Sequence, residues 1–381
     1  MLNHAEAFTH WMKHQALPAF LEKGIHHAES EGTSFTETLP AVPSDIRSRV
    51  QSRQLYVFAH ATRTGWIDGS SELERVLEKG LKPYHDSQGV FYFSNGSNEQ
   101  AKRQNAYEQA FALLAYSELY NLTADPRFRK QAEQLHDWMQ KYLCLAEGGY
   151  ALHSGRPSLL SQNPHMHLFE AALAWWSATK DPRWEKEAHQ IFSLFRRHFF
   201  DEKNGCLIEF FAPGWLATLS ESRQLDPGHH YEWIWLLYEY QSIAGVDTSR
   251  WRNALLGFIT PCGENTRTGA VMNEIWSDKT PCRTASRLWC QTERIKADVV
   301  NILTHPQESS CRQIETHTGN MLRLYIEPPT VGVYCDEITD TGEQIVAPAP
   351  ASTLYHLYVA SRQVERVLPV LAAQHYVEIA R

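Results

Sequence analysis

The chain has 381 residues, of which 43% are hydrophobic and 12% aromatic, so it can bury a large core, and its length suits one barrel-sized domain. Its net charge of −8 argues against nucleic acid or an anionic membrane as the main partner. The first residues contain no basic segment followed by an apolar stretch, and no apolar run approaches the roughly 18 residues of a membrane span. We therefore expect a cytoplasmic protein.

Seven cysteines are scattered along the chain without any Cys-x-x-Cys pair. This spacing indicates reduced thiols and argues against a structural zinc site. We expect no cofactor.

Polar residues recur at the predicted starts of apolar helices. The last five are spaced by 60, 62, 64 and 63 residues, and the first precedes the second by 54. These positions are Arg53, Tyr107, His167, His229, Glu293 and His356. Self-similarity at a fixed period is the mark of a repeated supersecondary unit.

A second, amphipathic helix follows the apolar one in each unit. Segments 124–139 and 180–195 match each other after Asp-Pro turns, and 246–259 is a looser copy. Repeated helix hairpins can form an open solenoid or a closed barrel. The first helices are apolar nearly all round, as an inner ring requires, and the second carry a charged face. The pattern favours an all-α (α/α)6 barrel as one domain over residues 1–381, with the polar helix starts around one pocket.

Short β-like stretches lie between the helical units, at 89–94, 148–153, 205–211, 269–276, 321–327 and 332–337. We expect them to form small hairpins at one end of the barrel. No strand alternates with helices at the spacing of a βαβ unit, which argues against a Rossmann or TIM fold. Segment 328–352 is long and irregular, and such loops are usually functional or mobile.

Two His-x-x-Glu pairs carry the chemical signal. His229 and Glu232 follow a Pro-Gly turn, and His167 and Glu170 follow Asn163 and a proline. Residues three apart share a helix face, so each carboxylate can fix the tautomer of its histidine and raise its basicity. Histidine exchanges protons near neutral pH, which makes these pairs candidates for acid and base catalysis. His356 has no carboxylate at this spacing. His230 is better explained as a bystander beside His229, and His165 shares a helix face with neither His167 nor Glu170.

These segments resemble the N-acylglucosamine 2-epimerase superfamily of sugar epimerases and aldose–ketose isomerases, from about residue 45 to 365. The matching motifs are RQLYVFAHA with Arg53, YEQAF with Tyr107, NPHMHLFEA with Asn163, His167 and Glu170, PGHHYEW with His229 and Glu232, LWCQTERIKA with Trp289 and Glu293, and STLYHLYVA with His356. Trp233 and the apolar residues around His356 are similar to the mannose isomerase branch. YEQAF departs from the pattern, because Glu108 and Gln109 stand where relatives often have Asp and His.

The resemblance implies an (α/α)6 barrel, no catalytic metal, and catalysis by His229 and His356. Moving a proton between carbons 1 and 2 of a sugar passes through an enediolate, which needs an acid, a base and positive charge for the oxyanion. Arg53 suits the oxyanion. His167 would bind sugar hydroxyls, Glu170 and Glu232 would orient the histidines, and Tyr107, Asn163, Trp289 and Glu293 complete the expected substrate-binding set.

The expected reaction interconverts D-mannose and D-fructose, with D-lyxose and D-xylulose as a further pair. No Lys or Arg cluster stands beside the motifs, so we expect a free monosaccharide. The alternatives are a sugar 2-epimerase, a glycoside hydrolase using Glu170 and Glu232, a metal enzyme built on the His and Glu pairs, and a non-catalytic sugar-binding protein. Whether the protein is a homo-oligomer is left open by the sequence.

Overall fold

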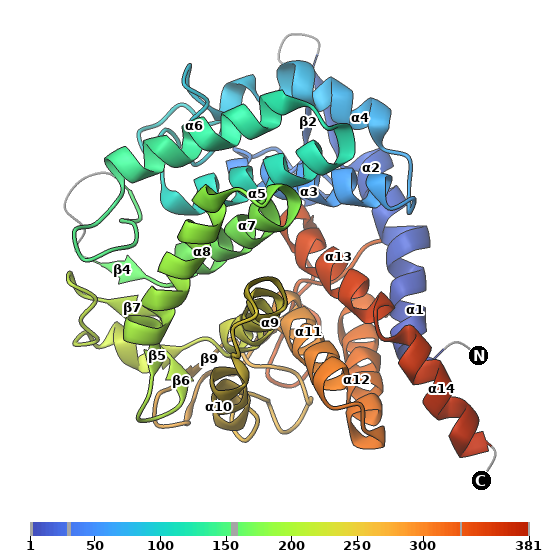
Figure 1. The fold of residues 1–381 in the computed structure, drawn as a ribbon. Coiled ribbons are helices and arrows are strands. Elements are labelled where there is room, and N and C mark those ends of the chain that lie inside the picture. The colour runs from blue at the N-terminus through green and yellow to red at the C-terminus, as the bar shows by residue number, and fades with distance from the viewer. Residues whose placement is uncertain (1–2, 29–31, 154–158, 328–329, 380–381) are drawn as a thin grey trace.

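Six long helices, which alternate along the chain with the outer helices, form a closed inner ring. The computed structural model describes residues 3–28, 32–153, 159–327 and 330–379 (Figure 1). The inner helices are α3 (Ser48–Arg63), α5 (Ala106–Thr123), α7 (Asn163–Thr179), α9 (Pro227–Ala244), α11 (Leu288–Thr304) and α13 (Ala351–Glu365). Each contacts the next, and α13 contacts α3. The predicted (α/α)6 barrel is thus confirmed.

The inner helices are buried because they lack a polar face. In α9 the side chains of Trp233, Leu237 and Tyr240 are all buried, and an α-helix surrounded by protein must be apolar on every side. The side chains of these helices that line the main cavity all come from the first two turns, so they lie at one end of the ring. No helix in the described ranges is long and apolar enough to cross a membrane.

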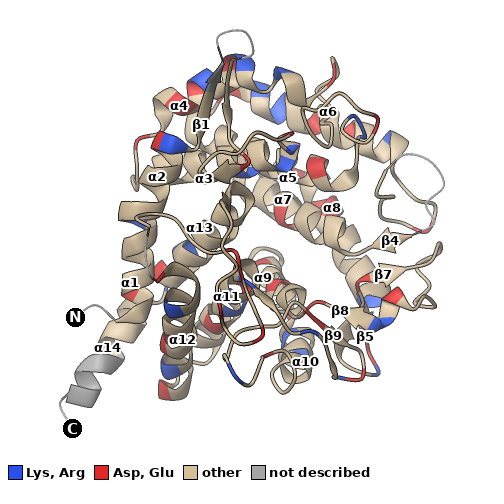
Figure 2. Ribbon diagram, turned by 180° about the vertical axis from the view of Figure 1, so that it is seen from behind, with Lys and Arg blue, Asp and Glu red and all other residues tan. Residues whose placement is uncertain are grey.

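Amphipathic helices pack outside the ring. They are α4 (Ser70–Arg75), α6 (Pro126–Tyr142), α8 (Pro182–Leu194), α10 (Ser249–Ile259) and α12 (Glu308–Met321). The Asp-Pro turns begin α6 and α8, because Asp125 and Asp181 each accept a hydrogen bond from a first-turn backbone N–H and proline fills the first helical position. Lys and Arg (blue) and Asp and Glu (red) both occur along outer helices such as α6 and α12 (Figure 2).

The outer cover of α13 comes from the N-terminus. Helix α1 (His4–Trp11), the π-helical turn η1 (Met12–Ala16) and α2 (Leu17–Lys23) form one continuous arm, and α1 contacts both α12 and α13. If the barrel were six hairpins in sequence, the outer partner of α13 would be the next helix, α14 (Leu368–Ile379). Instead, α14 contacts α12 and extends from the barrel near the N-terminus (Figure 1). The repeat does not reach the N-terminal arm, so it could not predict this exchange.

All strands are short and all pairings are antiparallel. They are β1 (Ile25–Ala28) with β2 (Gly32–Phe35), β3 (Thr38–Leu39) with β13 (Ala349–Pro350), β4 (Leu160–Ser161) with β7 (Phe210–Phe211), β5 (Phe200–Asp201) with β6 (Cys206–Leu207), β8 (Gln224–Leu225) and β10 (Pro281–Arg283) on either side of β9 (Glu274–Trp276), and β11 (Ser286–Arg287) with β12 (Glu337–Ile338). Many pairs therefore join loops of different repeats, for example Leu39 opposite Ala349. These strand pairings hold the loops together over one end of the barrel.

The β-like stretches are only partly confirmed as strands. Segment 205–211 contains β6 and β7, 269–276 forms a strand only at its end, and 332–337 only at Glu337. Segments 89–94 and 148–153 make isolated bridges. The prediction for 321–327 is wrong, because α12 continues into the π-helical turn η6 (Leu322–Ile326) and buries Met321, Leu324 and Tyr325 at helical spacing. Of the predicted loop 328–352, residues 328–329 lie outside the described residues.

A side chain near the start of five inner helices holds the backbone of the preceding loop. Three are glutamines whose side-chain amides hydrogen-bond to both the backbone N–H and the C=O of one loop residue: Gln51 to Phe35, Gln109 to Phe91 and Gln291 to Val271. His165 and His230 accept from the backbone N–H of Tyr150 and Leu207. Gln109 therefore makes the kind of loop contact that a histidine makes in other repeats, which accounts for one of the two departures in YEQAF. His230 is not a bystander, because it and His165 each hold a loop backbone through a buried hydrogen bond.

Candidate active site

A cavity of about 420 Å³ opens where the inner helices begin. Eight of the ten predicted site residues line it, one or two from each inner helix: Arg53, Tyr107, Asn163, His167, His229, Glu232, Trp289 and His356. The other two, Glu170 and Glu293, lie behind His167 and His356 and contact them. The sixty-residue recurrence therefore brings all ten residues to one end of the barrel. Their roles in binding and catalysis remain predictions.

The carboxylate partner of His229 comes from a loop. Glu209, between β6 and β7, accepts a hydrogen bond from His229 Nδ1 at 2.9 Å, and Asp226 Oδ2 lies 3.9 Å from the same nitrogen. Gln162 holds the Glu209 carboxylate and accepts from the indole N–H of Trp233. The prediction that Glu232 orients His229 is wrong, because the β4–β7 pairing brings Glu209 over the start of α9.

Burial and charge act in opposite directions on His229. Burial lowers its pKa, but the carboxylates of Glu209 and Asp226 outweigh burial and raise the pKa to about 10. His229 is therefore an imidazolium at neutral pH. With Nδ1 bonded to Glu209, Nε2 is the nitrogen left for the cavity, and it carries a proton.

His356 finds its partner on the neighbouring helix. Its Nδ1 lies 2.8 Å from Glu293 Oε1, and the other oxygen of Glu293 lies 2.5 Å from Lys296 Nζ. Burial lowers the pKa of His356 well below its ordinary value, and the positive charges of Arg53 and Lys296 lower it further. His356 is therefore neutral, with Nδ1 donating to Glu293 and a basic Nε2.

The indole of Trp289 lies between the two histidines. Its ring centroid is 5.2 Å from the His229 ring and 5.5 Å from the His356 ring. Gly228 packs against the same indole, and a Cβ at that position would come within 2.6 Å of it. The site thus holds one protonated and one neutral histidine on either side of an aromatic wall.

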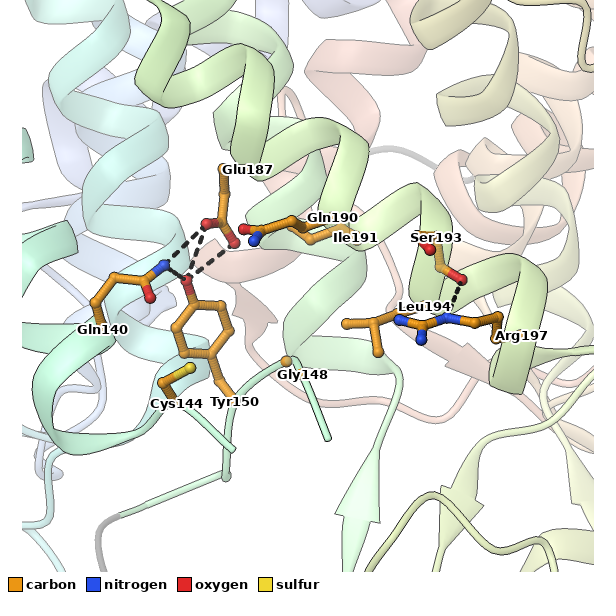
Figure 3. Close-up of a pocket in the computed structure, with 11 residues that line it drawn as sticks. Gln140, Cys144, Gly148, Tyr150, Glu187, Gln190, Ile191, Ser193, Leu194 and Arg197 are labelled. Carbon is orange, nitrogen blue, oxygen red and sulfur yellow. Dashed lines mark hydrogen bonds between the residues drawn. The ribbon is translucent and has the colours of Figure 1, made fainter. Parts of the chain in front are cut away.

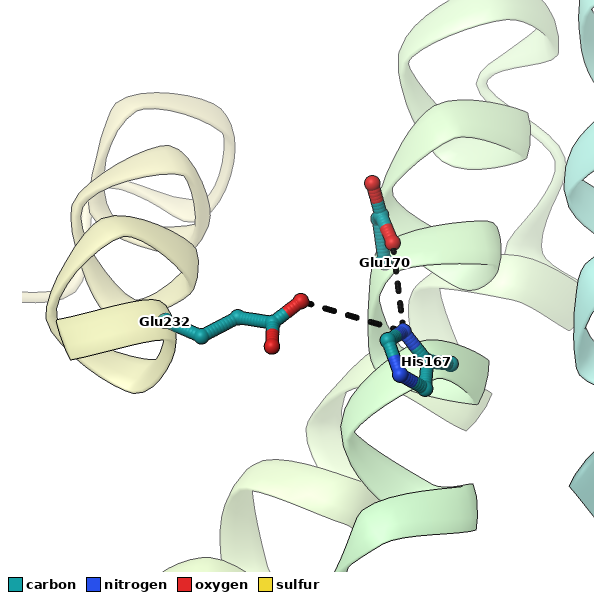
Figure 4. Close-up of side chains that lie close together, drawn as sticks. All are labelled: His167, Glu170 and Glu232. Carbon is teal, nitrogen blue, oxygen red and sulfur yellow. Dashed lines mark ion pairs between the residues drawn. The ribbon is translucent and has the colours of Figure 1, made fainter. Parts of the chain in front are cut away.

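His167 lies between two carboxylates from different helices. Its Nδ1 is 3.6 Å from Glu170 Oε2 and 3.9 Å from Glu232 Oε1 (Figure 4). Glu170 also accepts a hydrogen bond from the hydroxyl of Tyr355. The predicted His167–Glu170 pairing is present as a contact of 3.6 Å, whereas Glu232 turns toward His167 rather than toward His229.

Burial keeps these carboxyl groups at least partly protonated at neutral pH. Burial raises the pKa of Glu170 to about 7 and that of Glu232 to about 8, although Lys296 opposes both shifts. Burial and the charge of Arg53 keep the pKa of His167 well below its ordinary value. Glu232 is therefore mainly a neutral acid that can donate to, or accept from, a hydroxyl group.

Arg53 faces the cavity without a carboxylate partner among the described residues. Its guanidinium donates to the Tyr107 hydroxyl at 3.1 Å and to the Ser352 carbonyl at 3.2 Å, and stacks 4.1 Å from the Phe111 ring centroid. A fixed positive charge in this position suits a developing oxyanion.

Three further arginines surround the opening, which the sequence did not predict. Arg47 pairs with Glu37, Arg49 lies 2.6 Å from Glu108, and Arg287 lies 3.6 Å from Asp226. All three line the cavity. The sequence shows no basic cluster beside the motifs, but folding brings these three arginines together at the opening of the cavity.

Two groups could geometrically accept a metal ion. They are His167, Glu170 and Glu232, and Glu232, Glu293 and His356, with ligand atoms within 4.8 Å of one another. Lys296 and Arg53 already supply positive charge to these carboxylates. Like-charge repulsion from both cations weighs against a divalent ion here.

Two other hollows differ from this site. One of about 170 Å³ lies between α6 and α8, where Gln140 and Tyr150 donate to Glu187 and so satisfy its carboxylate (Figure 3). Another of about 520 Å³ lies at the far end of the ring and reaches Glu170 from behind. Neither contains a histidine pair like that of the main cavity.

Comparison with known proteins identifies the chain as an (α/α)6-barrel enzyme of the sugar isomerase and epimerase superfamily. The chain belongs to the N-acylglucosamine 2-epimerase (GlcNAc 2-epimerase) family, which it matches over residues 35–360. This confirms the resemblance seen in the sequence and implies a small sugar as substrate.

Relatives of known name agree with the mannose isomerase branch. The chain is 31% identical to the mannose-6-phosphate isomerase of Rhizobium meliloti (strain 1021), covering 94% of this chain and 96% of that protein. It is 25% identical to the D-mannose isomerase of Thermobifida fusca, covering 85% of each. A solved D-mannose isomerase structure has the same fold, with a TM-score of 0.84, 18% identity and coverage of 96% and 97%.

Proposed function

We propose that the protein interconverts D-mannose and D-fructose through an enediolate, with His356 and His229 as base and acid. The observation that carries this proposal is the pair of histidines on either side of Trp289, each with its Nδ1 at hydrogen-bond distance from a buried carboxylate. Each Nδ1 is held by a carboxylate, so each presents Nε2 to the cavity. A neutral and a protonated imidazole are the two groups that a 1,2-proton transfer requires.

The proposed chemistry assigns one task to each group. His229, as an imidazolium, protonates the ring oxygen during ring opening and then the carbonyl oxygen. Neutral His356 removes the proton from carbon 2, exchanges it with water at Nε2, and delivers a proton to carbon 1. Arg53 stabilises the oxygen that gains negative charge. In ring opening His229 regains a proton from the anomeric hydroxyl of the substrate. In the isomerisation, after it protonates the oxygen on carbon 1, it regains the proton of the hydroxyl on carbon 2 as the ketone forms.

Unsatisfied polar atoms of the site suit sugar hydroxyls. Within the described chain, both carboxyl oxygens of Glu232, Oδ1 of Asn163 and Nδ1 of His167 are buried without a hydrogen-bond partner. Burying such atoms unpaired is costly, so a ligand that supplies donors and acceptors would be favoured. Several hydroxyl groups on a small ring match this need, with Tyr107 and Trp289 as packing surfaces.

A second candidate substrate is the 6-phosphate of the same sugar. The arginines Arg47, Arg49 and Arg287 at the opening favour it, as does the name of the Rhizobium meliloti relative. We favour the free sugar, because each of these arginines already faces a carboxylate. Comparing kcat/KM for mannose and mannose 6-phosphate decides between them.

Product analysis separates isomerase from epimerase and hydrolase. Purified, chelator-treated protein is incubated with mannose, fructose, glucose, lyxose and a short mannan, and the products are identified by NMR. Fructose from mannose supports the proposal. Glucose without ketose would make the protein an epimerase, shorter saccharides would make it a hydrolase, and activity that returns only with a divalent ion would overturn the metal-free mechanism.

A further inference from the structure

Lys296 is a buried charge next to the proposed catalytic centre. It lies on α11, one turn after Glu293, and both side chains are 0% exposed. Its Nζ is 2.5 Å from Glu293 Oε2 and 3.7 Å from the ring centroid of Trp235. Lysine is almost never fully buried unless it is paired, so this placement requires a reason.

Lys296 and His356 hold the same carboxylate from two sides. Glu293 Oε2 faces Lys296, and Oε1 faces His356 Nδ1 at 2.8 Å. A carboxylate bound at Oε2 by an ammonium group stays an acceptor at Oε1. His356 must then carry its proton on Nδ1, which leaves the lone pair on Nε2, toward the cavity.

We propose that Lys296 is a positioning residue of the catalytic centre, which holds Glu293 as an oriented anion and thereby fixes the basic tautomer of His356. This inference rests on the proposed function, because it concerns how the base of that reaction is prepared. Lys296 does not line the cavity and has no contact with the sugar in this account.

A purely structural role explains Lys296 less well. A buried ion pair often contributes no more to stability than apolar side chains of similar volume. A lysine here makes sense if its charge is used, and the shared carboxylate shows where that charge acts.

Several other charges face Glu293 and His356 and must be counted. They are Arg53 from α3, His167 and Glu170 from α7, His229 and Glu232 from α9, and Arg287 from β11. Burial raises the pKa of Glu293, and Lys296 is the strongest influence opposing that rise. Lys296 also lowers the pKa of His356, after burial and Arg53. Removing the ammonium charge therefore raises both pKa values.

The test compares Lys296→Met with Lys296→Arg and with Arg294→Met. Arg294 is a matched control, because it is a buried cation on the same helix that pairs at 2.7 Å with Glu264, away from the cavity.

We expect Lys296→Met to lower kcat about 10–100-fold, as typical for residues that orient a functional side chain, with KM little changed. The acid limb of kcat/KM should move to higher pH by about 1–3 units. Lys296→Arg should recover part of kcat and part of the shift in the acid limb. Arg294→Met should change neither kcat nor the acid limb.

A measurement without turnover keeps this inference separate from the proposed function. In protein with ¹⁵N-labelled histidine, the His356 signals are assigned by their loss in His356→Ala and titrated by NMR. We expect Lys296→Met to raise the pKa of His356 and mix its tautomers, whether or not mannose is the substrate. If Lys296→Met does not fold, Lys296→Gln takes its place.

Unchanged His356 tautomer, pKa and kcat in a folded Lys296 variant would overturn the inference. The same result in Arg294→Met as in Lys296→Met would also overturn it, because the effect would then be general destabilisation. Wild-type protein that converts none of the sugars would instead refute the proposed function, while the NMR titration would still judge the role of Lys296.

Discussion

Glu209 is the residue whose role differs most from expectation, and its loss should change the proposed acid. Its carboxylate holds His229 Nδ1 and raises the pKa of that histidine. In Glu209→Gln the charge is gone, so the pKa of His229 falls and the alkaline limb of the rate profile should move to lower pH by about 1–3 units. Steady-state kinetics across pH check this. Glu202→Gln, at an exposed carboxylate, is the control. An unmoved alkaline limb in Glu209→Gln would show that His229 is not the acid.

Glu232 should make the protein less stable as pH rises. In the folded state its pKa is about 8, above its ordinary value of 4.5. The folded state therefore binds more protons than the unfolded state between these pH values, and this contribution to stability is full at low pH and lost as pH rises through about 8. In Glu232→Gln the fall in the free energy of unfolding between pH 5 and 8 should be smaller. Denaturant unfolding at several pH values measures it, and an equal fall in both proteins would contradict the prediction.

The sequence predicted the residues of the site better than their pairings. All ten predicted residues stand on helices whose starts repeat, so a period alone brings them together. Glu209 was missed because it lies on a loop, and no helical spacing relates it to His229. The i, i+3 rule states that Glu232 and His229 share a helix face, but it does not say which neighbour a long side chain will reach, and Glu232 reaches His167 instead.

At the scale of the helix, the Asp-Pro turns should contribute stability without affecting activity. Asp181 caps α8 through the backbone N–H of Arg183 and pairs with Arg129 of α6 at 2.7 Å. Asp181→Ala removes the cap, and we expect the free energy of unfolding to fall by about 1 kcal/mol. Urea denaturation measures the change and kinetics check that kcat is preserved, since Asp181 does not line the cavity. A large loss of kcat would show that the outer ring shapes the site.

The helices were predictable and the strands were not, for a physical reason. A helix of four turns gives many chances for its 3.6-residue period to appear, whereas segments of two or three strand residues give almost none. The stretch 321–327 is apolar and aromatic, which suits a strand or a buried helix equally. Because α12 continues into this stretch, its apolar side chains are buried against the core in a helical conformation.

For the whole molecule, the N-terminal arm should be essential to the closed ring. Phe8 of α1 is fully buried in the common core, and α1 covers α12 and α13. Phe8→Ala should lower the free energy of unfolding by about 3–5 kcal/mol, as for other buried aromatic residues. If the chain is one domain, calorimetry should show one transition that moves to lower temperature. A separate transition for the arm, with the barrel unchanged, would contradict this prediction.

The most direct test of the central claim is the position of deuterium in the product. Mannose is incubated with the chelator-treated protein in heavy water, and the products are followed by NMR. Proton transfer through an enediolate predicts fructose that carries solvent deuterium at carbon 1, and mannose recovered from the reverse reaction with deuterium at carbon 2. His356→Ala should form product about 10²–10⁴-fold more slowly, the range for a lost general base. Fructose that forms at full rate in His356→Ala, or that contains no solvent deuterium, would contradict the two-histidine account.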